Sequence, residues 1–566
     1  MAESAMEMSN PVPGSTQIGR PMNWAKPLLW VWILALIALP SLLLLGVSFM
    51  RSSGGAIVYD ASIANYLRLF QSASFLTLLG KTVLVAAGSA IAAALIAFPM
   101  AYYASRVLSR GRLTAVLLVI IPLWISMLMR VFAWKLILGE RGVLNSFLLW
   151  AGILDQPSNA FLYTGFSVFL TFIYISIPFI FVSAYAALER IPENLLEAAR
   201  DSGAGPVRVI TTVVWPLARP GVAIGVALAF LMSVGDYITP AMVGGLNGTM
   251  VGTVIASQFG IASNWPLGAS MALVLMLTVV AVLAITFYLA RSPGILTGED
   301  GGKSVPVPRT GVKAWVGMAL FIVPYLFLYA PLLVIVLFSF NSNSVQSFPL
   351  ESFTLHWYQQ MLGNTAMMDA LQRSLLVGAS VLVLSVVLGS GFAIMLGLGK
   401  VARAAWLEKL LAVPVALPGV VLGITLVLAF KLLHVPQGIP SVILGHCSFV
   451  MPVVMMIVLS RLRRLDPALI EASYDLGADQ WRTFLNVLFP LIRSAIFGGA
   501  LLGFTLSVDE VIVTLFLSGT EPTLPVWVWN QMRFGFTPSM NAIFTCIGAV
   551  TLVLILLAQR LIRTER

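Results

Sequence analysis

Long apolar runs are the feature that most restricts what this chain can fold into. Stretches of about 20 apolar residues recur along it, and 59% of its residues are hydrophobic while only 10% are charged. A soluble protein carries about a quarter charged residues. A helix needs about 20 apolar residues to cross a bilayer, and inside lipid every backbone group must be paired within its own segment. The sequence therefore predicts an all-α membrane protein.

Hydropathy predicts twelve transmembrane helices, six in each half of the chain. The predicted spans are 27–49, 76–104, 114–138, 162–188, 218–240 and 268–290, then 314–339, 373–398, 405–432, 438–460, 492–517 and 541–562. Residues 1–26 are polar and lack the organisation of a cleavable signal peptide, which predicts a disordered cytoplasmic tail. Residues 292–313 are rich in Gly, Pro and charge, as linkers are. The predicted halves are therefore 27–291 and 314–566.

A short polar segment occurs once in each half. Glu197-Ala-Ala-Arg-Asp-Ser-Gly203, followed by Pro216, matches Glu471-Ala-Ser-Tyr-Asp-Leu-Gly477, followed by Pro490, at a constant shift of 274 positions. Each segment, 191–216 and 465–490, predicts a short helix that ends at a glycine and leads into the fifth span of its half. A single copy reads equally well as an interfacial helix that joins two spans. Repetition at the same spacing argues against that interpretation.

The distribution of Lys and Arg predicts the orientation. Most basic residues fall in alternate connecting segments, including both copies of the polar segment and their surroundings. Cytoplasmic loops carry an excess of Lys and Arg. We therefore expect both polar segments and both chain termini on the cytoplasmic side.

The doubled segment resembles the signature of binding-protein-dependent ABC importer permeases. This signature begins with Glu-Ala-Ala, three further residues and a Gly. After nine more residues it has a hydrophobic residue, which lies two positions before the Leu of a Leu-Pro pair. Val213 and Val487 fit the hydrophobic position, whereas Trp215, Phe489 and Ser473 depart from it conservatively. In that family the segment is a coupling helix that docks on a cytoplasmic ATPase. The resemblance assigns this role to Glu197, Ala198, Ala199, Asp201 and Gly203, and to Glu471, Ala472, Asp475 and Gly477.

The resemblance covers both halves and implies a fused permease of a type I importer. Its implied partners are a cytoplasmic ABC ATPase dimer, an external solute-binding protein, a small-molecule substrate and the lipid bilayer, with no nucleic acid. ATP and Mg would be bound by the ATPase, so this chain itself would bind no cofactor and would not be an enzyme. The implied location is the bacterial inner membrane.

Acidic residues near the ends of the fifth and eleventh spans are candidate substrate or gate residues. Asp236 and Glu510 correspond under the shift of 274, and Asp509 lies beside Glu510. Ionisable residues within a membrane are costly and are functional candidates by default, although water at the membrane surface would make these carboxylates inexpensive. The aromatic residues Tyr237, Trp124 and Trp134 could stack on alkylammonium groups or anchor the lipid interface.

The sequences around these acids resemble spermidine/putrescine importer permeases. The stretches are SVGDYITPAMVGG at 233–245 and FTLSVDEVIVTLFLSG at 504–519. The resemblance implies a small cationic amine, such as a polyamine or opine, as substrate. Fused importers of iron(III) or thiamine are the alternative within the same class.

Other functions fit the sequence less well. Gly302-Lys303-Ser304 lacks the preceding glycine of a phosphate-binding loop, so ATP binding is not expected here. No cluster of residues predicts a metal or catalytic site, and the spacing of Cys447 and Cys546 predicts neither a disulfide nor a metal site. An ion-driven secondary transporter would share the helices but would leave the doubled segment unexplained.

Overall fold

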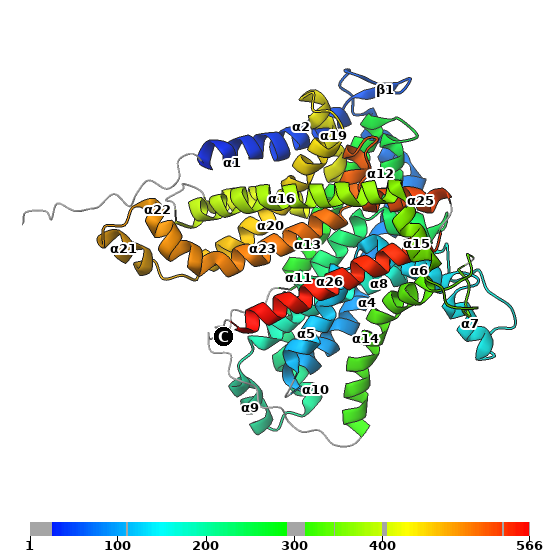
Figure 1. Cartoon of the computed structure of the whole chain (residues 1–566), viewed down its shortest axis with the longest axis horizontal. Helices are drawn as coiled ribbons and strands as arrows, with labels where there is room; N and C mark the ends of the chain where they lie inside the picture. The colour runs from blue at the N-terminus through cyan, green and yellow to red at the C-terminus, as the bar shows by residue number, and fades with distance from the viewer. Residues whose placement is uncertain are drawn as a thin grey trace, which may run out of the picture. The chain divides into compact units, whose positions relative to one another are not determined.

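The computed structural model describes residues 25–108, 111–290, 312–344, 346–398, 404–534 and 537–564, and these are largely helical (Figure 1). Most of the predicted tail 1–26 and linker 292–313 lies outside this part of the chain. Within it, nine helices are long and apolar enough to cross a membrane. They are Lys26–Ser48, Ala73–Arg106, Gly165–Glu189, Pro206–Gly235, Trp265–Leu289, Met318–Ser339, Thr365–Leu398, Ile439–Leu462 and Gln480–Asp509.

Two further spans are broken, which corrects the continuous helices predicted at 114–138 and 405–432. Arg112–Leu123 and Met127–Trp150 meet at 86°, and Ala404–Val415 and Gly419–Leu432 meet at 100°. The extended backbone at Ile125 and Ser126 separates the first pair, and Pro418 separates the second. Pro418 has an extended backbone with ψ 134°, and without an N–H group it cannot donate the hydrogen bond that would continue the preceding helix. Counting each bent pair as one span gives eleven in the described part, and α26 (Ser539–Thr564) covers the predicted twelfth.

The fifth span of each half also differs from its predicted limits, 218–240 and 492–517. In both halves a short helix and a π-helical turn run directly into the span: α10 (Pro206–Val209), η3 (Ile210–Val214) and α11 (Trp215–Gly235), then α22 (Gln480–Thr483), η5 (Phe484–Leu488) and α23 (Phe489–Asp509). The first of these spans ends just before Asp236, and the second ends at Asp509, just before Glu510. Short helices follow, η4 (Pro240–Gly244) and α24 (Ile512–Leu517).

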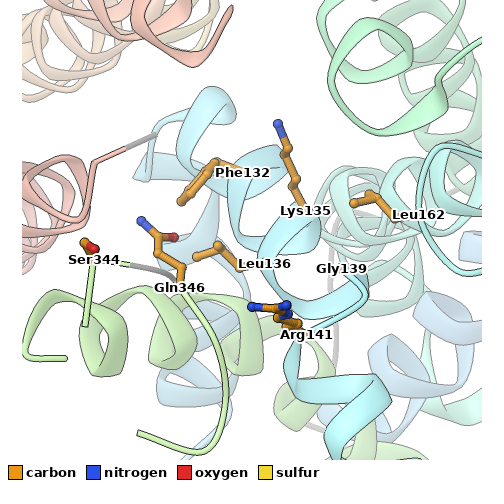
Figure 2. A pocket seen from close by; sticks show the side chains of 9 residues that line it. Phe132, Lys135, Leu136, Gly139, Arg141, Leu162, Ser344 and Gln346 are labelled. Atoms are coloured by element: carbon orange, nitrogen blue, oxygen red, sulfur yellow. The ribbon is translucent and has the colours of Figure 1, made fainter. Parts of the chain in front are cut away.

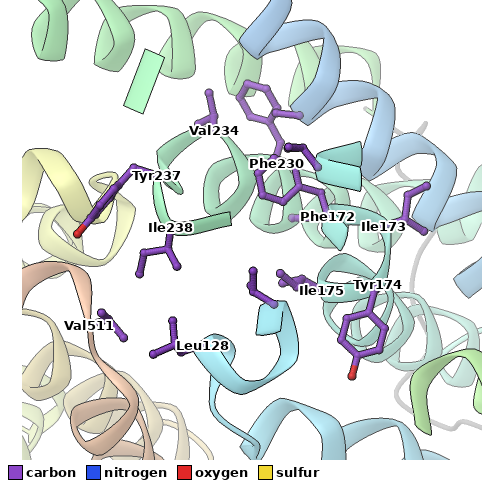
Figure 3. Packing of buried hydrophobic residues seen from close by; sticks show 14 of the residues in the cluster. Leu128, Phe172, Ile173, Tyr174, Ile175, Phe230, Val234, Tyr237, Ile238 and Val511 are labelled. Carbon is purple, nitrogen blue, oxygen red and sulfur yellow. The ribbon is translucent and has the colours of Figure 1, made fainter. Parts of the chain in front are cut away.

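The chain divides into two compact units, each built from both halves of the sequence. The larger unit comprises residues 40–376, 416–445 and 508–566. In it α4 (Ala73–Arg106) packs on α8 (Gly165–Glu189) and α11, while α14 (Val312–Ser339) packs on α4, α6 (Met127–Leu138) and α26. Small residues allow this contact: Ala86, Ala90, Ala93 and Ala97 of α4 are fully buried. Figure 3 shows the larger side chains from α8, α11 and their neighbours that fill the interior.

Shorter elements complete the larger unit. The strands β1 (Arg51–Ser53) and β2 (Ala56–Val58) form an antiparallel hairpin in which Arg51 pairs with Val58. The unit's further helices are α2 (Leu39–Ser48), α3 (Ala64–Gln71), α5 (Arg112–Ile120), α7 (Val143–Trp150), α9 (Glu193–Asp201), α12 (Val251–Phe259), α13 (Trp265–Leu289), α15 (His356–Gly363), α19 (Gly419–Leu432) and α25 (Leu524–Phe534). Gly419 and Gly423, four positions apart, lie where α19 contacts α24. Such small-residue spacing is typical of closely packed membrane helices.

The smaller unit comprises residues 1–39, 377–415 and 446–507. It contains α1 (Ala25–Ile33) with the π-helical η1 (Leu34–Ala38), most of α16 (Thr365–Leu398), α17 (Ala404–Leu411), most of α20 (Ile439–Leu462), α21 (Ala468–Asp475) and most of α23. Gly389 brings α16 onto α20, and Gly499 and Gly503 bring α23 onto Val450 and Val454 of α20. The small-residue spacing in α23 therefore also marks a close helix contact.

Candidate functional site

The repeated polar segment forms the same local structure in both copies. The first copy is α9, which is followed by Gly203 with φ +79°, and the second is α21, which is followed by Gly477 with φ +80°. At the first end, the N–H of Gly203 donates to the Arg200 carbonyl at 2.8 Å, and that of Ala204 donates to the Ala199 carbonyl at 3.0 Å. These are the two bonds of a Schellman cap.

The second copy repeats this cap bond for bond. The N–H of Gly477 donates to the Tyr474 carbonyl at 2.9 Å, and that of Ala478 donates to the Ser473 carbonyl at 3.1 Å. Donors and acceptors are shifted by the same 274 positions as the sequence motif. The glycine is required at this point because an L residue with a side chain rarely adopts a positive φ.

The residues assigned to ATPase docking face solvent in both copies. Glu197, Ala198, Asp201 and Gly203 are exposed and Ala199 is half-buried; Glu471, Ala472, Asp475 and Gly477 are exposed. The first helix is anchored below by Leu196, which is 2% exposed, whereas no residue of α21 is buried. Two glutamate-bearing helical surfaces are therefore available to another protein. Their docking role stays a prediction.

The two copies are held differently within their own units. In the first, Glu193 at the start of α9 forms an ion pair with Arg106 at the end of α4, at 3.1 Å, and Arg106 also donates to the carbonyls of Leu188 and Ile191. Position 467 in the second copy, which corresponds to Glu193, is a proline. There Arg463 at the end of α20 instead pairs with Glu408 of α17. The sequence repeat gave no indication of these ion pairs.

The paired acids at the end of the fifth spans serve as helix caps. The Asp236 carboxylate, 1% exposed, accepts hydrogen bonds from the N–H groups of Ile238 at 2.7 Å and Thr239 at 3.1 Å, and from the Thr239 hydroxyl. The half-buried Glu510 accepts from the N–H of Val513 at 2.9 Å, at the start of α24. Each acid therefore satisfies backbone donors where its span gives way to a short helix. Contact with substrate stays a prediction for both.

Asp509 connects the second half of the chain to the broken third span. Both of its carboxylate oxygens accept from the N–H of Met127, at 3.0 and 3.1 Å, and the Ser126 side chain also bonds to it. Ser126 is the N-cap residue of α6, but its own side chain does not cap the helix. Arg130, buried one turn along α6, adds a positive charge near the carboxylate. Asp509 thus caps a helix that lies about 380 residues earlier in the sequence.

An equivalent junction joins the first half to the broken ninth span. Gly235 corresponds to Asp509 at the shift of 274, while Ser126 and Pro418 are 292 positions apart, as are the starts of α4 and α16. A Cβ on Gly235 would lie 2.7 Å from the Pro418 Cβ, so the two backbones meet directly. The fifth span of each half therefore ends at the break in the third span of the other half. The contact is made by the Asp509 carboxylate in one junction and by Gly235 in the other.

The candidate aromatic residues are partly packed into the protein. Tyr237 is 5% exposed and lies edge-on to Trp529, with 5.9 Å between ring centroids. Trp134, also 5% exposed, packs against Tyr174 and Phe327 at 5.7 and 5.2 Å. Trp124 is the last residue of η2 (Ile121–Trp124), and its side chain lies outside the described part of the structure. Substrate contact by these residues stays a prediction.

Comparison with known families identifies the kind of protein. A model of the family described as "Binding-protein-dependent transport system inner membrane component" matches residues 110–296 and again residues 385–564. Together these stretches make up more than half of the chain. The chain belongs to this family. It carries the permease domain twice, in one polypeptide, and the expected ABC importer permease is confirmed.

Several known permeases are similar to about one half of this fused permease. The spermidine/putrescine transport system permease protein PotB of Haemophilus influenzae is 31% identical over 265 residues, covering 47% of this chain and 92% of PotB. The inner membrane ABC transporter permease protein YdcU of Escherichia coli is 35% identical over 276 residues, 47% of this chain and 85% of YdcU. The putrescine transport system permease protein PotI of Escherichia coli is 33% identical over 259 residues, 44% of this chain and 90% of PotI.

Proposed function

We propose that this permease carries a small cationic amine of the polyamine class across the membrane. PotB and PotI are named for spermidine and putrescine, and each is matched over nine-tenths or more of its length. Residues 233–245 and 504–519 of this chain carry the acids and aromatic residues that suit an alkylammonium substrate. Iron(III) or thiamine in the same class of importer would be revealed by the same experiment.

The energy for transport comes from a separate ATPase dimer that docks on α9 and α21. The observation that carries this proposal is the pair of identical Schellman-capped helices, each presenting an exposed glutamate, Glu197 or Glu471. A solvent-exposed helix with a rigid end can transmit a rigid-body movement into the span that follows it. ATP and Mg are bound by the ATPase, and this chain binds no cofactor and catalyses no reaction.

The coupling segments, the N-terminus and the C-terminus face the cytoplasm of a bacterial cell. The excess of Lys and Arg on that side supports this orientation. A solute-binding protein delivers substrate on the opposite, periplasmic face. The family description, which makes transport dependent on a binding protein, supports that partner.

Asp236 and Glu510 line the gate of the pathway, together with Asp509 and Tyr237. The carboxylates of Asp236 and Glu510 already accept backbone hydrogen bonds at the breaks between helices. A change in these caps would alter how the short helices η4 and α24 are held, and ammonium groups of a substrate could take the place of the backbone donors. Trp124 and Trp134 are the further aromatic candidates. The permease would alternate between two states, each favoured by different partners.

Uptake into proteoliposomes tests this function. The permease is reconstituted with its ATPase and its binding protein, and labelled putrescine, spermidine, thiamine and iron(III) are each offered with and without ATP. The proposal requires amine uptake that needs both ATP and the binding protein. Uptake driven by an ion gradient without ATP would instead show a secondary transporter, and uptake of iron(III) or thiamine would reject the amine class.

A further inference from the structure

A pocket of about 330 Å³ lies at the C-terminal end of α6 (Figure 2). One wall is the end of α6 and the turn after it, with Lys135, Leu136 and Arg141, and the facing wall is the segment after α14, with Ser344 and Gln346. All of these residues belong to the larger unit. The residues that line the pocket include none of the helix-cap residues described above and none of the coupling segments.

Hydrogen bonds fix the two walls of this pocket. The Phe348 N–H donates to the Arg141 carbonyl at 3.1 Å, and the Ser146 hydroxyl donates to the Phe348 carbonyl at 2.9 Å. The Asn145 side chain donates to the Gly139 carbonyl at 2.9 Å. The turn is so tight that a Cβ on Gly142 would lie 2.3 Å from the Leu136 carbonyl oxygen. The pocket is therefore a defined shape and not a gap between loose loops.

The chemistry of the pocket suits a carboxylate. Lys135 and Arg141 bring two positive charges, and among the described residues no carboxylate is within ion-pairing distance of either. The Lys135 ammonium lies 5.9 Å from the centre of the Tyr163 ring, which leaves it able to bind an anion. Both amide atoms of Gln346 are shielded from solvent and lack a partner in the part of the chain that the structure describes. Its N–H₂ group can complete a carboxylate site.

The pocket lies at the end of the membrane helices opposite to the first coupling segment. Leu162, which also lines it, comes just before α8, and α9 follows the other end of α8. A helix of 25 residues is about 37 Å long, which is enough to cross the bilayer. If α9 meets the ATPase, the pocket therefore opens on the side where the binding protein arrives.

We propose that this pocket accepts an aspartate or glutamate side chain of the external binding protein and determines which way round that protein docks. The inference rests on the proposed function. The second half offers no counterpart, because only six residues separate α19 from α20, whereas residues 139–164 separate α6 from α8. Only the first half of the pseudo-symmetric permease therefore carries this pocket, so a partner that binds it can dock in one orientation. The transported amine is not the occupant, since two cations would repel it.

Charge reversal tests the proposal in the complete reconstituted system. Lys135→Glu combined with Arg141→Glu should raise the binding-protein concentration needed for half-maximal uptake roughly tenfold or more, with ATPase activity measured without binding protein unchanged. For the unaltered permease this concentration should rise with salt, because partly exposed charges are screened, and the double variant should lose that dependence. Arg68→Glu is the matched control: Arg68 is an exposed arginine outside the pocket, just before the start of α4, and α4 ends at the first coupling segment.

The outcomes separate this proposal from the proposed function. An unchanged half-maximal concentration in the double variant would overturn the docking site, as would an equal effect of Arg68→Glu. An effect of the double variant that appears only in vesicles containing anionic lipid would also overturn it. If charge reversal prevents folding, Lys135→Gln with Arg141→Gln replaces it and should shift the concentration in the same direction. If the unaltered permease shows no need for a binding protein, the proposed function itself has failed.

Discussion

Replacing Asp509 by Ala should weaken the attachment of α6 while replacing it by Asn should largely preserve it. The carboxylate accepts both from the Met127 N–H and from Ser126, and the Ser126 side chain does not itself cap that helix end. Ala removes the acceptor. Asn retains a carbonyl oxygen and is as good a helix cap as Asp.

The magnitude follows from the groups left unpaired. Loss of an N-cap costs about 0.5–2 kcal/mol, and a buried donor left without an acceptor costs about 1–3 kcal/mol. Because these describe the same contact, we expect Asp509→Ala to destabilise the junction by about 1–3 kcal/mol in total. Such a change would shift the balance between two conformations of the permease by roughly fivefold to more than a hundredfold.

Thermal unfolding of the purified permease and ATP-driven uptake should be measured side by side. We expect Asp509→Ala to lower both the melting temperature and the uptake rate, and Asp509→Asn to keep most of each. Asp509→Asn that unfolds like the unaltered permease but transports no amine would show that the negative charge acts on substrate. Unfolding of Asp509→Ala at the unaltered temperature would refute the capping role.

Substitutions at four other positions, Gly235, Gly203, Gly477 and Arg106, also have expected outcomes. Gly235→Ala should reduce uptake and stability, because the added Cβ would lie 2.7 Å from a neighbouring proline, and normal uptake would contradict the close junction. Gly203→Ala and Gly477→Ala should each cost about 1–2 kcal/mol, visible as a lower melting temperature, because φ is +79° and +80°; equal melting temperatures would contradict this. Arg106→Gln should destabilise by about 3 kcal/mol, and a double-mutant cycle with Glu193→Gln should be non-additive, because the ion pair is largely buried. Additive effects would show that the pair is not coupled.

Much of the architecture could be predicted because the bilayer imposes it. Hydropathy located the helical spans, and the repeat located the two short helices α9 and α21 and the glycines that follow them, Gly203 and Gly477. Hydropathy could not locate the bends at Ser126 and Pro418, because a bent span has the same apolar composition as a straight one. It also extended the fifth spans past Gly235 and Asp509, because the short helix that begins after each break is itself apolar.

The roles of individual site residues were harder to predict. The sequence groups Asp509 with Glu510 as a substrate candidate because both are acids near membrane depth, and it gives no sign that the hydrogen-bond partner of Asp509 lies in the other half of the chain. Sequence reasoning about one segment cannot identify such a partner. The sequence nevertheless holds one signal: in the repeat, Gly235 of the first half corresponds to Asp509 of the second, so only one half has an acid at this position.

Cross-linking of the two coupling helices to the ATPase tests the central claim most directly. Glu197→Cys and Glu471→Cys are introduced separately into a permease in which Cys447 and Cys546 are replaced, with cysteines at the surface of the ATPase. We expect each variant to form a disulfide with the ATPase, cross-linking of both copies to stop ATP-driven uptake, and reduction to restore it. Absence of cross-linking from both positions in an actively transporting complex would contradict the claim.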